Sequence, residues 1–253
     1  MSINVVAQAL VTARRDRRAM DAALFAHALQ SPAQAYAVQD IVAGEMGWQA
    51  PGMPRFWKSG GPSREAALTH AALPPQGVWS SPANGERWPC FIRLIEAEVA
   101  LRLARDVSAA DAAAVTHESA PSLVDAMAVS IEVVDSRWQQ GPQAPALLKL
   151  ADLQSHGALA LGEWKPFAPR DWSAQQCRVQ IGAQPPAQFK GTHALGDPAW
   201  LLPIWLRHAT REGGVVAAGT VVTTGTWCGM LKASAGDLVT VRFDGIGEAT
   251  VQL

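Results

Sequence analysis

The sequence of 253 residues predicts one α+β domain, 1–253, with helices early and strands late. Apolar residues recur at helical spacing before residue 46, whereas short apolar runs that suit strands dominate from Phe91 onward. The stretch 51–90 between them is rich in proline and glycine, so it fits loops and short strands. We therefore expect a helical and loop-rich part over 1–85 and a β-rich core over 86–253.

Apolar spacing and capping residues locate the helices. The expected helices cover residues 4–30, 33–46, 121–128 and 198–212. Ser31-Pro32 separates the first two, because proline suits the first turn of a helix. Asp197-Pro198 is likewise a good pair of residues with which to begin the last helix. The second helix is expected to end near Gly47.

Apolar runs in the second half of the chain predict strands. These runs cover residues 92–103, 129–134, 157–162, 177–182, 220–224 and 238–243. The last run alternates between apolar and polar residues, and the turn sequence Asp244-Gly245-Ile246-Gly247 follows it. We therefore expect a closing hairpin in which residues 248–251 form the returning strand.

The bulk composition excludes several kinds of partner. Net charge is −1, which gives no electrostatic basis for binding nucleic acid or an anionic membrane surface, and no apolar run reaches the length of a membrane span. Cys90, Cys177 and Cys228 are widely spaced and odd in number, which predicts a reducing compartment such as the cytoplasm. Charged residues are sparse at 17%, which suggests that other subunits of a homo-oligomer cover part of the surface.

Three glutamates lie in strand-like apolar runs. Glu96 and Glu98 are two residues apart, so in a strand both side chains leave the same face. Glu132 lies in the next apolar run. Carboxylates in such surroundings repel one another and lose hydration, so they either become protonated or share a cation, for which a hard ion such as Mg²⁺ or Mn²⁺ is suited. By spacing alone, three exposed glutamates on the polar face of a sheet are an equally good interpretation.

Other familiar catalytic motifs are missing from the sequence. There is no G-x-S-x-G nucleophile elbow and no G-x-x-x-x-G-K-[ST] phosphate loop. The six histidines show no spacing typical of zinc sites. The glutamates therefore remain the best chemical indication that the sequence offers.

Six short segments, in matching order, resemble motifs of the fumarylacetoacetate hydrolase superfamily, in particular its branch of 2-keto-4-pentenoate hydratases and 4-oxalocrotonate decarboxylases. Residues 95–100 resemble the E-x-E metal motif, and residues 131–137 resemble the segment that supplies the third carboxylate. Residues 151–155 resemble an A-D-N-x-S stretch. The other similar segments are 56–60 (the G-x-K-x-G lysine), 221–226 (the V-x-L-T-G-x strand and loop) and 235–237 before the closing hairpin.

The resemblance implies a mixed sheet or roll core of the fumarylacetoacetate hydrolase C-terminal type and a bound Mg²⁺ or Mn²⁺. It implies a divalent-metal-dependent lyase acting on a small 2-oxo (dienol) acid, either a hydratase of the 2-hydroxypenta-2,4-dienoate type or a decarboxylase of the 4-oxalocrotonate type. The site residues that it implies are Glu96, Glu98 and Glu132 as metal ligands, Lys58 and Ser155 as catalytic residues, and Thr224 and Gly225 as substrate-binding residues. Each of the last four also has a structural interpretation, as a loop lysine over aromatic rings or as a turn residue.

The chain departs from the branch in ways that question hydration more than metal binding. Residues 73–77 contain no acid where the hydratases carry one, and Leu153 replaces the asparagine of A-D-N. Two alternatives therefore stay open. One is an acylpyruvate-type C–C bond hydrolase, which requires a general base such as His70 or His156 near the metal. The other is a catalytically degenerate member that keeps the fold as a binding or scaffolding subunit.

Overall fold

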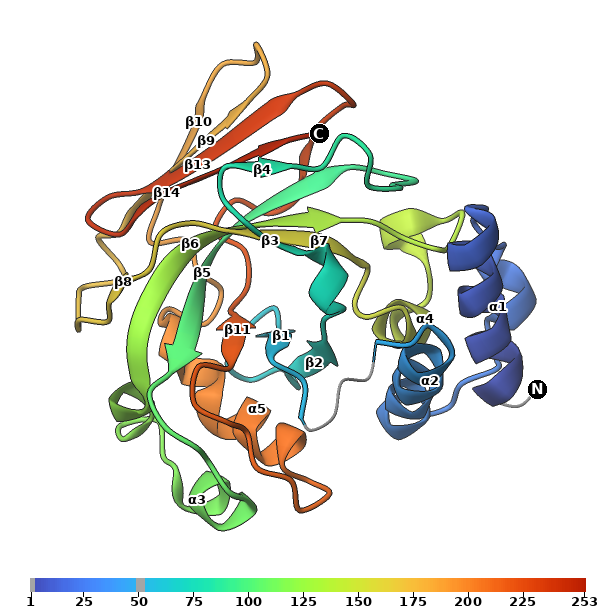
Figure 1. The fold of residues 1–253 in the computed structure, drawn as a ribbon, viewed down its shortest axis with the longest axis horizontal. Helices are drawn as coiled ribbons and strands as arrows, with labels where there is room; N and C mark the ends of the chain where they lie inside the picture. Colours follow the sequence, from blue (N-terminus) through green and yellow to red (C-terminus); the bar gives the residue numbers. More distant parts are fainter. Residues whose placement is uncertain (1–2, 49–52) are drawn as a thin grey trace.

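The structure is a computed structural model that describes residues 3–48 and 53–253, and it confirms an α+β fold with helices at the N-terminal end and curled mixed sheets after them (Figure 1). The first residues of the proline- and glycine-rich stretch, 51–52, lie outside the described residues. The rest of that stretch forms loops and short strands, as its composition predicted. Within the described ranges, no helix has both the length and the apolar character needed to cross a bilayer.

A large curled sheet of nine strands carries most of the core. Its strand order is β2-β1-β11-β5-β6-β7-β3, with β12 paired to β5 and β8 paired to β6. The pairs β1–β11 and β3–β7 are parallel, and the others are antiparallel. The strands are β1 Phe56–Gly60, β2 Thr69–Ala72, β3 Val78–Ser80, β5 Leu94–Leu103, β6 Val124–Val134, β7 His156–Leu161, β8 Lys165–Pro166, β11 Val221–Thr223 and β12 Leu231–Lys232.

A smaller sheet of five strands packs against the large one. Its order is β10-β9-β13-β14-β4, and β13 and β14 form the predicted C-terminal hairpin. Val241 and Val251 of this sheet share one buried core with Val129 and Ile131 of β6, which joins the two layers. The strands are β4 Ala83–Asn84, β9 Gln176–Ile181, β10 Ala187–Lys190, β13 Leu238–Phe243 and β14 Gly247–Gln252.

The helices begin where capping residues predicted. The Ser31 hydroxyl accepts a hydrogen bond from Gln34 N (3.4 Å), and Asp197 Oδ1 accepts one from Ala199 N (2.8 Å), which satisfies backbone donors at each start. The helices are α1 Ile3–Asp16, α2 Pro32–Glu45, α3 Ala109–Ala114, α4 Ala146–Ala151 and α5 Leu202–Ala209, and the 3₁₀ turns are η1 Ala22–Phe25, η2 Pro75–Gly77, η3 Ala120–Leu123, η4 Gly141–Gln143 and η5 Pro198–Leu201.

Two of the predicted helices are wrong in part. The first ends at Asp16, because Arg17 takes a left-handed backbone conformation (φ 51°) and Met20 then pairs with the segment around Trp138. The helix predicted over 121–128 is only the turn η3, because residues from Val124 onward pair with β5. Backbone hydrogen bonds to distant segments end the first helix and turn residues from Val124 onward into a strand. Helical periodicity in the sequence could not reveal these hydrogen bonds.

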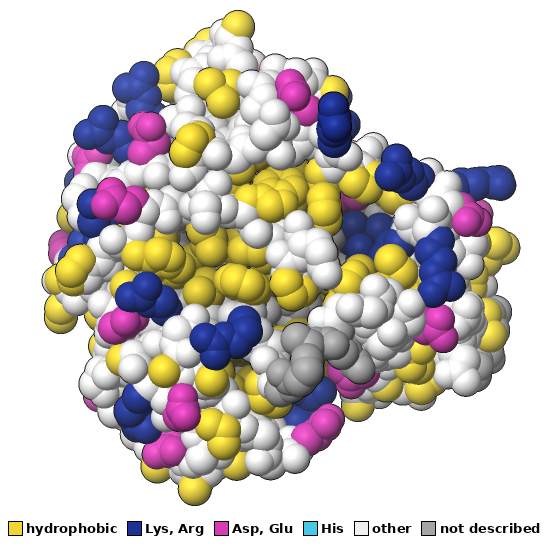
Figure 2. Space-filling model, in the orientation of Figure 1, with side chains coloured by type: hydrophobic (Ala, Val, Ile, Leu, Met, Phe, Trp, Pro, Cys, Tyr) yellow, Lys and Arg dark blue, Asp and Glu magenta, His cyan; other side chains and the backbone are white. Residues whose placement is uncertain are grey.

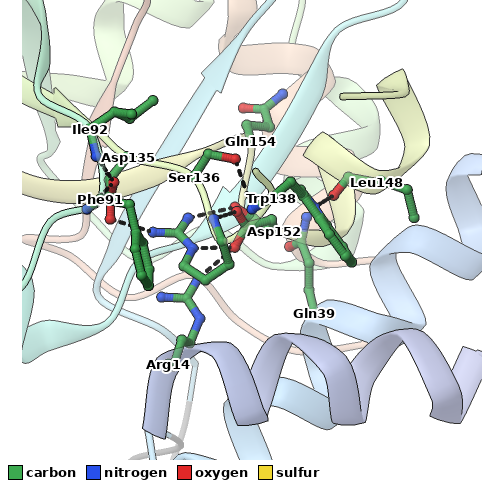
Figure 3. Close-up of polar contacts among 12 residues, drawn as sticks. Arg14, Gln39, Phe91, Ile92, Asp135, Ser136, Trp138, Leu148, Asp152 and Gln154 are labelled. Atoms are coloured by element: carbon green, nitrogen blue, oxygen red, sulfur yellow. Dashed lines mark hydrogen bonds and ion pairs between the residues drawn. The ribbon is translucent and has the colours of Figure 1, made fainter. Parts of the chain in front are cut away.

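Buried ion pairs attach helix α1 to the loops beside β6 and β7 (Figure 3). Arg14 Nη2 lies 2.9 Å from Asp152 Oδ1, and Arg137 Nε lies 2.6 Å from the same oxygen. The Arg137 backbone N–H donates to Asp152 Oδ2 (2.9 Å). Asp135 Oδ1 in turn accepts two backbone N–H groups of the segment before β5. The N-terminal helix is therefore joined to the β core through one fully buried carboxylate, Asp152.

Replacing Asp152 by alanine is expected to destabilise the protein by about 3–5 kcal/mol, because it leaves Arg14 and Arg137 buried without their shared counter-charge. Urea unfolding measures the change in free energy. The matched control is Glu45→Ala, which breaks the exposed Arg15–Glu45 pair (3.4 Å) and should cost at most about 1 kcal/mol. Equal losses in the two variants would contradict the importance of the Asp152 contacts.

Candidate metal centre

Three carboxylates converge on one face of the large sheet. Glu96 and Glu98 lie on β5, and the antiparallel register of β5 and β6 places Glu132 directly opposite Glu96. Residues that face each other across a pair of strands, or that lie two apart on one strand, share a face of the sheet. One oxygen of each carboxylate lies within 4.8 Å of the others. The structure thus brings together the three glutamates named from the sequence.

Two donors from β11 and the loop after it hold Glu98. Its Oε2 atom accepts hydrogen bonds from the Thr223 hydroxyl and from the backbone N–H of Gly225 (3.0 Å). The Thr223 hydroxyl also lies 2.9 Å from Ser130 Oγ, and Ser130 is the residue opposite Glu98 on β6. Thr223 and Ser130 were not predicted as site residues, since only strand pairing reveals that their hydroxyls meet this carboxylate.

Glu132 has one satisfied and one unsatisfied oxygen. Its Oε1 atom lies 2.5 Å from Lys58 Nζ and 3.0 Å from His156 Nδ1. Its Oε2 atom is buried and has no hydrogen-bond partner in the part of the chain that the structure describes. Buried polar atoms of native proteins are nearly always paired, with protein groups, water or an ion. The free oxygen therefore fits a site that takes a cation or water.

Lys58 reaches this site from β1. Strand β1 pairs with β11, so Lys58 is the neighbour of Thr223 in the sheet. Its Nζ atom also donates to the carbonyl oxygen of Gln154 (3.3 Å). Burial alone would lower the pKa of this lysine, but the neighbouring carboxylates, Glu132 first, raise it above its ordinary value. Lys58 is thus a buried cation in a cluster of acids, only 8% exposed.

The acidic cluster favours protons or a cation. Burial, and then repulsion by Glu132, raise the pKa of Glu96 to about 8 and that of Glu98 to about 7. Burial also opposes charge on Glu132, but Lys58 and His156 outweigh it, and the pKa of Glu132 is lowered. Without a metal ion, Glu96 is therefore mostly protonated at neutral pH and Glu98 is partly protonated. The all-oxygen donor set and the unpaired Glu132 oxygen fit a hard divalent cation.

A small cavity opens onto two of the carboxylates, Glu96 and Glu98. Its volume is about 220 Å³, a size that suits a small acid. The residues that line it are Lys58, Ser59, Gly60, Gly61, Glu96, Glu98, Gln154, Gly225 and Thr226. A larger hollow of about 660 Å³ lies beside the β13–β14 hairpin, but the carboxylates are not among the residues that line it. The chemistry therefore identifies the smaller cavity as the candidate active site.

Ser155 and Thr224 lie close to the cavity in the chain but do not line it. Leu153, Gln154 and Ser155 form a left-handed turn, with φ values of 52°, 55° and 60°. This turn presents the Gln154 carbonyl to Lys58, while the buried Ser155 hydroxyl has no partner among the described residues. The Thr224 hydroxyl donates to the Val99 carbonyl (2.7 Å), so it stabilises the sheet. The next residue, Gly225, lines the cavity.

The two histidines considered as general bases lie in different places. His70 hydrogen-bonds with Ser59 Oγ (2.8 Å), its partner in the β1–β2 pairing. Because neighbouring residues of a strand point to opposite faces, the Ser59 side chain points away from that of Lys58 and from the carboxylates. Burial lowers the pKa of His70 to about 3. His156, in contrast, contacts Glu132 directly.

Comparison with known sequences places the chain among enzymes of one family. Residues 73–253 match the family model described as Fumarylacetoacetate (FAA) hydrolase C-terminal. The chain is 31% identical over 164 residues to 2-keto-4-pentenoate hydratase 1 of Dechloromonas aromatica (strain RCB), a match that covers 62% of this chain and 58% of the relative. It is 27% identical over 162 residues to the 2-hydroxyhexa-2,4-dienoate hydratase of Comamonas testosteroni, with the same coverage. The chain thus matches less than two thirds of the length of these relatives.

Solved structures show the same fold. The 4-oxalocrotonate decarboxylase from Pseudomonas putida G7, complexed with magnesium and adipate, superposes with a TM-score of 0.80 over 99% of this chain and 96% of that one, at 17% identity. The 5-carboxymethyl-2-hydroxymuconate delta-isomerase from Mycobacterium smegmatis gives 0.56 over 80% of this chain and 78% of that one, at 18% identity. At such identities the likeness concerns the fold. Together with the family model, which covers most of the sequence, it shows that the chain belongs to the fumarylacetoacetate hydrolase family.

Proposed function

We propose that the protein is a divalent-metal-dependent lyase acting on a small 2-oxo (dienol) acid. The observation that carries this proposal is the convergence of three carboxylates within 4.8 Å, next to a buried lysine, at a cavity of about 220 Å³. The names of the matched relatives, two hydratases of 2-keto or 2-hydroxy acids and a decarboxylase, support the same substrate class. The presence of all three carboxylates disfavours the alternative of a catalytically degenerate scaffolding subunit.

Glu96, Glu98 and Glu132 are the proposed ligands of Mg²⁺ or Mn²⁺. Such an ion, when bound, supplies a Lewis acid that polarises the ketone of a 2-oxo acid. The protein contributes the orientation of the ligands. Thr223 and Gly225 hold Glu98, and contacts on one oxygen of Glu132 leave its other oxygen free to bind.

Lys58 is the proposed proton donor. The carboxylates around it keep it protonated, and its two contacts, with Glu132 and the Gln154 carbonyl, fix the position of Nζ at the cavity. From there Nζ can deliver a proton to a substrate carbon or pair with a substrate carboxylate. The Gly225 backbone, which lines the cavity, is proposed to contact the substrate. The Ser155 hydroxyl, which has no partner among the described residues, is proposed to bind a water molecule beside the substrate.

Decarboxylation fits the cavity better than hydration. Hydration requires a group that activates water, but the described residues 73–77 contain no acid, and the charged residues that line the cavity are Lys58, Glu96 and Glu98. Decarboxylation requires only an electron-withdrawing centre and a proton donor, which the proposed metal and Lys58 supply. Neither of the two histidines considered for the hydrolase alternative is a free base in the described structure, since His70 is turned away and His156 hydrogen-bonds with Glu132.

The first test of this proposal is substrate turnover. Purified protein with Mg²⁺ is expected to release CO₂ from 4-oxalocrotonate and to hydrate 2-hydroxypenta-2,4-dienoate slowly or not at all. Ultraviolet absorbance follows both substrates. Efficient turnover of the dienoate alone would overturn the preference for decarboxylation but keep the lyase class. Turnover of neither substrate would contradict the class itself.

Substitutions should separate metal binding from proton transfer. Glu98→Gln is expected to weaken Mg²⁺ binding by about tenfold or more, because it removes a charged ligand. Lys58→Met should retain the metal but lower kcat by about 10²–10⁴, the usual contribution of a positioned acid or base. The matched control is Lys165→Met, at an exposed lysine paired with Glu163, which should leave both quantities unchanged. A Lys58 variant with normal kcat would exclude the proposed role.

The raised pKa values of Glu96 and Glu98 predict how stability depends on pH. Their folded pKa values, about 8 and about 7, exceed the ordinary value of 4.5, so the folded protein binds more protons than the unfolded chain between these limits. The metal-free protein should therefore lose stability as pH rises from about 5 to about 8. Mg²⁺ must displace these protons, so it should raise the melting temperature more at high pH than at low pH.

Thermal unfolding with and without Mg²⁺, across this pH range, measures both effects. The double variant Glu96→Gln, Glu98→Gln removes the two titrating groups and should flatten the dependence of the metal-free protein. An unchanged pH dependence in this variant would show that other groups control stability.

A further inference from the structure

A second cleft lies between helix α1, the end of α2 and the β core. It consists of two adjoining cavities of about 250 Å³ and 170 Å³, whose shared lining residues are Arg14, Met46, Trp48, Trp88 and Gly157. In the described part of the chain, the cleft and the carboxylate cavity have no lining residue in common. In the view of Figure 2, Lys or Arg side chains lie in a recess between the N-terminal helices and the strands. This cleft is therefore separate from the candidate active site.

The cleft carries an excess of positive charge. Arg14, Arg17 and Arg137 line its smaller cavity. Two carboxylates, Asp135 and Asp152, pair with Arg14 and Arg137, and Arg17 makes no ion pair with any described residue. Three cations thus face two anions. Burial, and then the nearby Arg137, lower the pKa of Arg14 to about 9, so an additional anion in the cleft would relieve an unfavourable environment.

Two buried nitrogen atoms of the lining have no partner. Arg14 Nε and His156 Nε2 are both without a hydrogen bond in the described structure. His156 is only 1% exposed and lines the larger cavity. Its Nδ1 atom hydrogen-bonds with Glu132 Oε1. Its Nε2 atom, on the other side of the ring, has no partner among the described residues and is free to bind a ligand.

Flat apolar groups form the walls of the cleft. The rings of Trp48, Trp88 and Phe91 and the side chain of Met46 line it. The Arg14 guanidinium lies over the Trp48 ring, 5.0 Å from its centroid. Such walls suit a planar ligand, because planar groups stack on aromatic rings and guanidinium planes.

We propose that this cleft binds a small planar carboxylate that also carries a hydroxyl group, such as a hydroxybenzoate. Its carboxylate is placed at Arg14 and Arg17, and its hydroxyl, which can donate or accept, hydrogen-bonds with His156 Nε2. Arg17, which makes no ion pair with a described residue, and the unpaired Arg14 Nε match the carboxylate of such a molecule. His156 Nε2 matches its hydroxyl, and the aromatic walls match its planar ring. Since His156 also hydrogen-bonds Glu132, the occupant lies one side chain away from a proposed metal ligand.

Isothermal titration calorimetry of the metal-free protein with 4-hydroxybenzoate tests this proposal. We expect saturable binding of one ligand per chain. Benzoate should bind about tenfold more weakly, because it leaves the buried His156 Nε2 without a hydrogen-bond partner. Arg17→Gln should weaken 4-hydroxybenzoate binding by about fivefold or more. Arg17 is exposed and makes no ion pair in the described structure, so this variant should fold normally.

Two control variants make the outcomes distinct. Arg18→Gln changes a neighbouring exposed arginine that does not line the cleft, and it should bind 4-hydroxybenzoate like the parent protein. Glu98→Gln changes the carboxylate cavity and should also leave this binding unchanged. No saturable binding, or equal losses for Arg17 and Arg18, would overturn the proposal. Loss of binding in Glu98→Gln would place the ligand in the carboxylate cavity instead, and the proposal would again fail.

Discussion

Mutual repulsion among three carboxylates, two of them buried and one half-buried, is the constraint on which the rest of the site depends. Glu96, Glu98 and Glu132 converge within 4.8 Å in a place where burial already disfavours charge. The fold surrounds them with compensating groups: the Lys58 ammonium, the imidazole of His156, and donors to Glu98 from β11 and the loop after it. These groups orient Glu98 and Glu132 but leave the buried Oε2 atom of Glu132 without a partner among the described residues, so the arrangement is complete only with a cation or bound protons.

Strand order explains why this arrangement is possible. The carboxylates lie on the adjacent strands β5 and β6, while Lys58 arrives on β1, which is separated from β5 only by β11. The consecutive strands β5 and β6 thus meet β1 and β11, which come from distant parts of the sequence, at one site. The large sheet is strongly curved (Figure 1), so its strands surround one region of the molecule. A rigid sheet fixes the acids more firmly than loops would, which suits a site that must hold like charges together.

The N-terminal helices contribute to the site indirectly. Arg14 of α1 contacts the Asp152 carboxylate (Figure 3), which Arg137 shares. Asp152 directly precedes the left-handed turn that presents the Gln154 carbonyl to Lys58. Arg14 and Arg137 also line the second cleft, and His156 both lines this cleft and hydrogen-bonds with Glu132. The helical part therefore does two things: it supports the turn beside the proposed proton donor, and it creates a pocket of its own.

The sequence alone determined the local pattern: strand-like runs, capped helix starts, the closing hairpin and the shared face of Glu96 and Glu98, because these depend on residues close together in the chain. It could not determine that the first helix ends at Asp16, or that Thr223 and His156 reach the carboxylates. Those features follow from hydrogen bonds between segments far apart in the sequence. Only the tertiary structure decided which groups are buried together. Burial and neighbouring groups determine the pKa of each acid, and strand pairing brings those neighbours beside it. The charges of the site therefore depend on the tertiary structure.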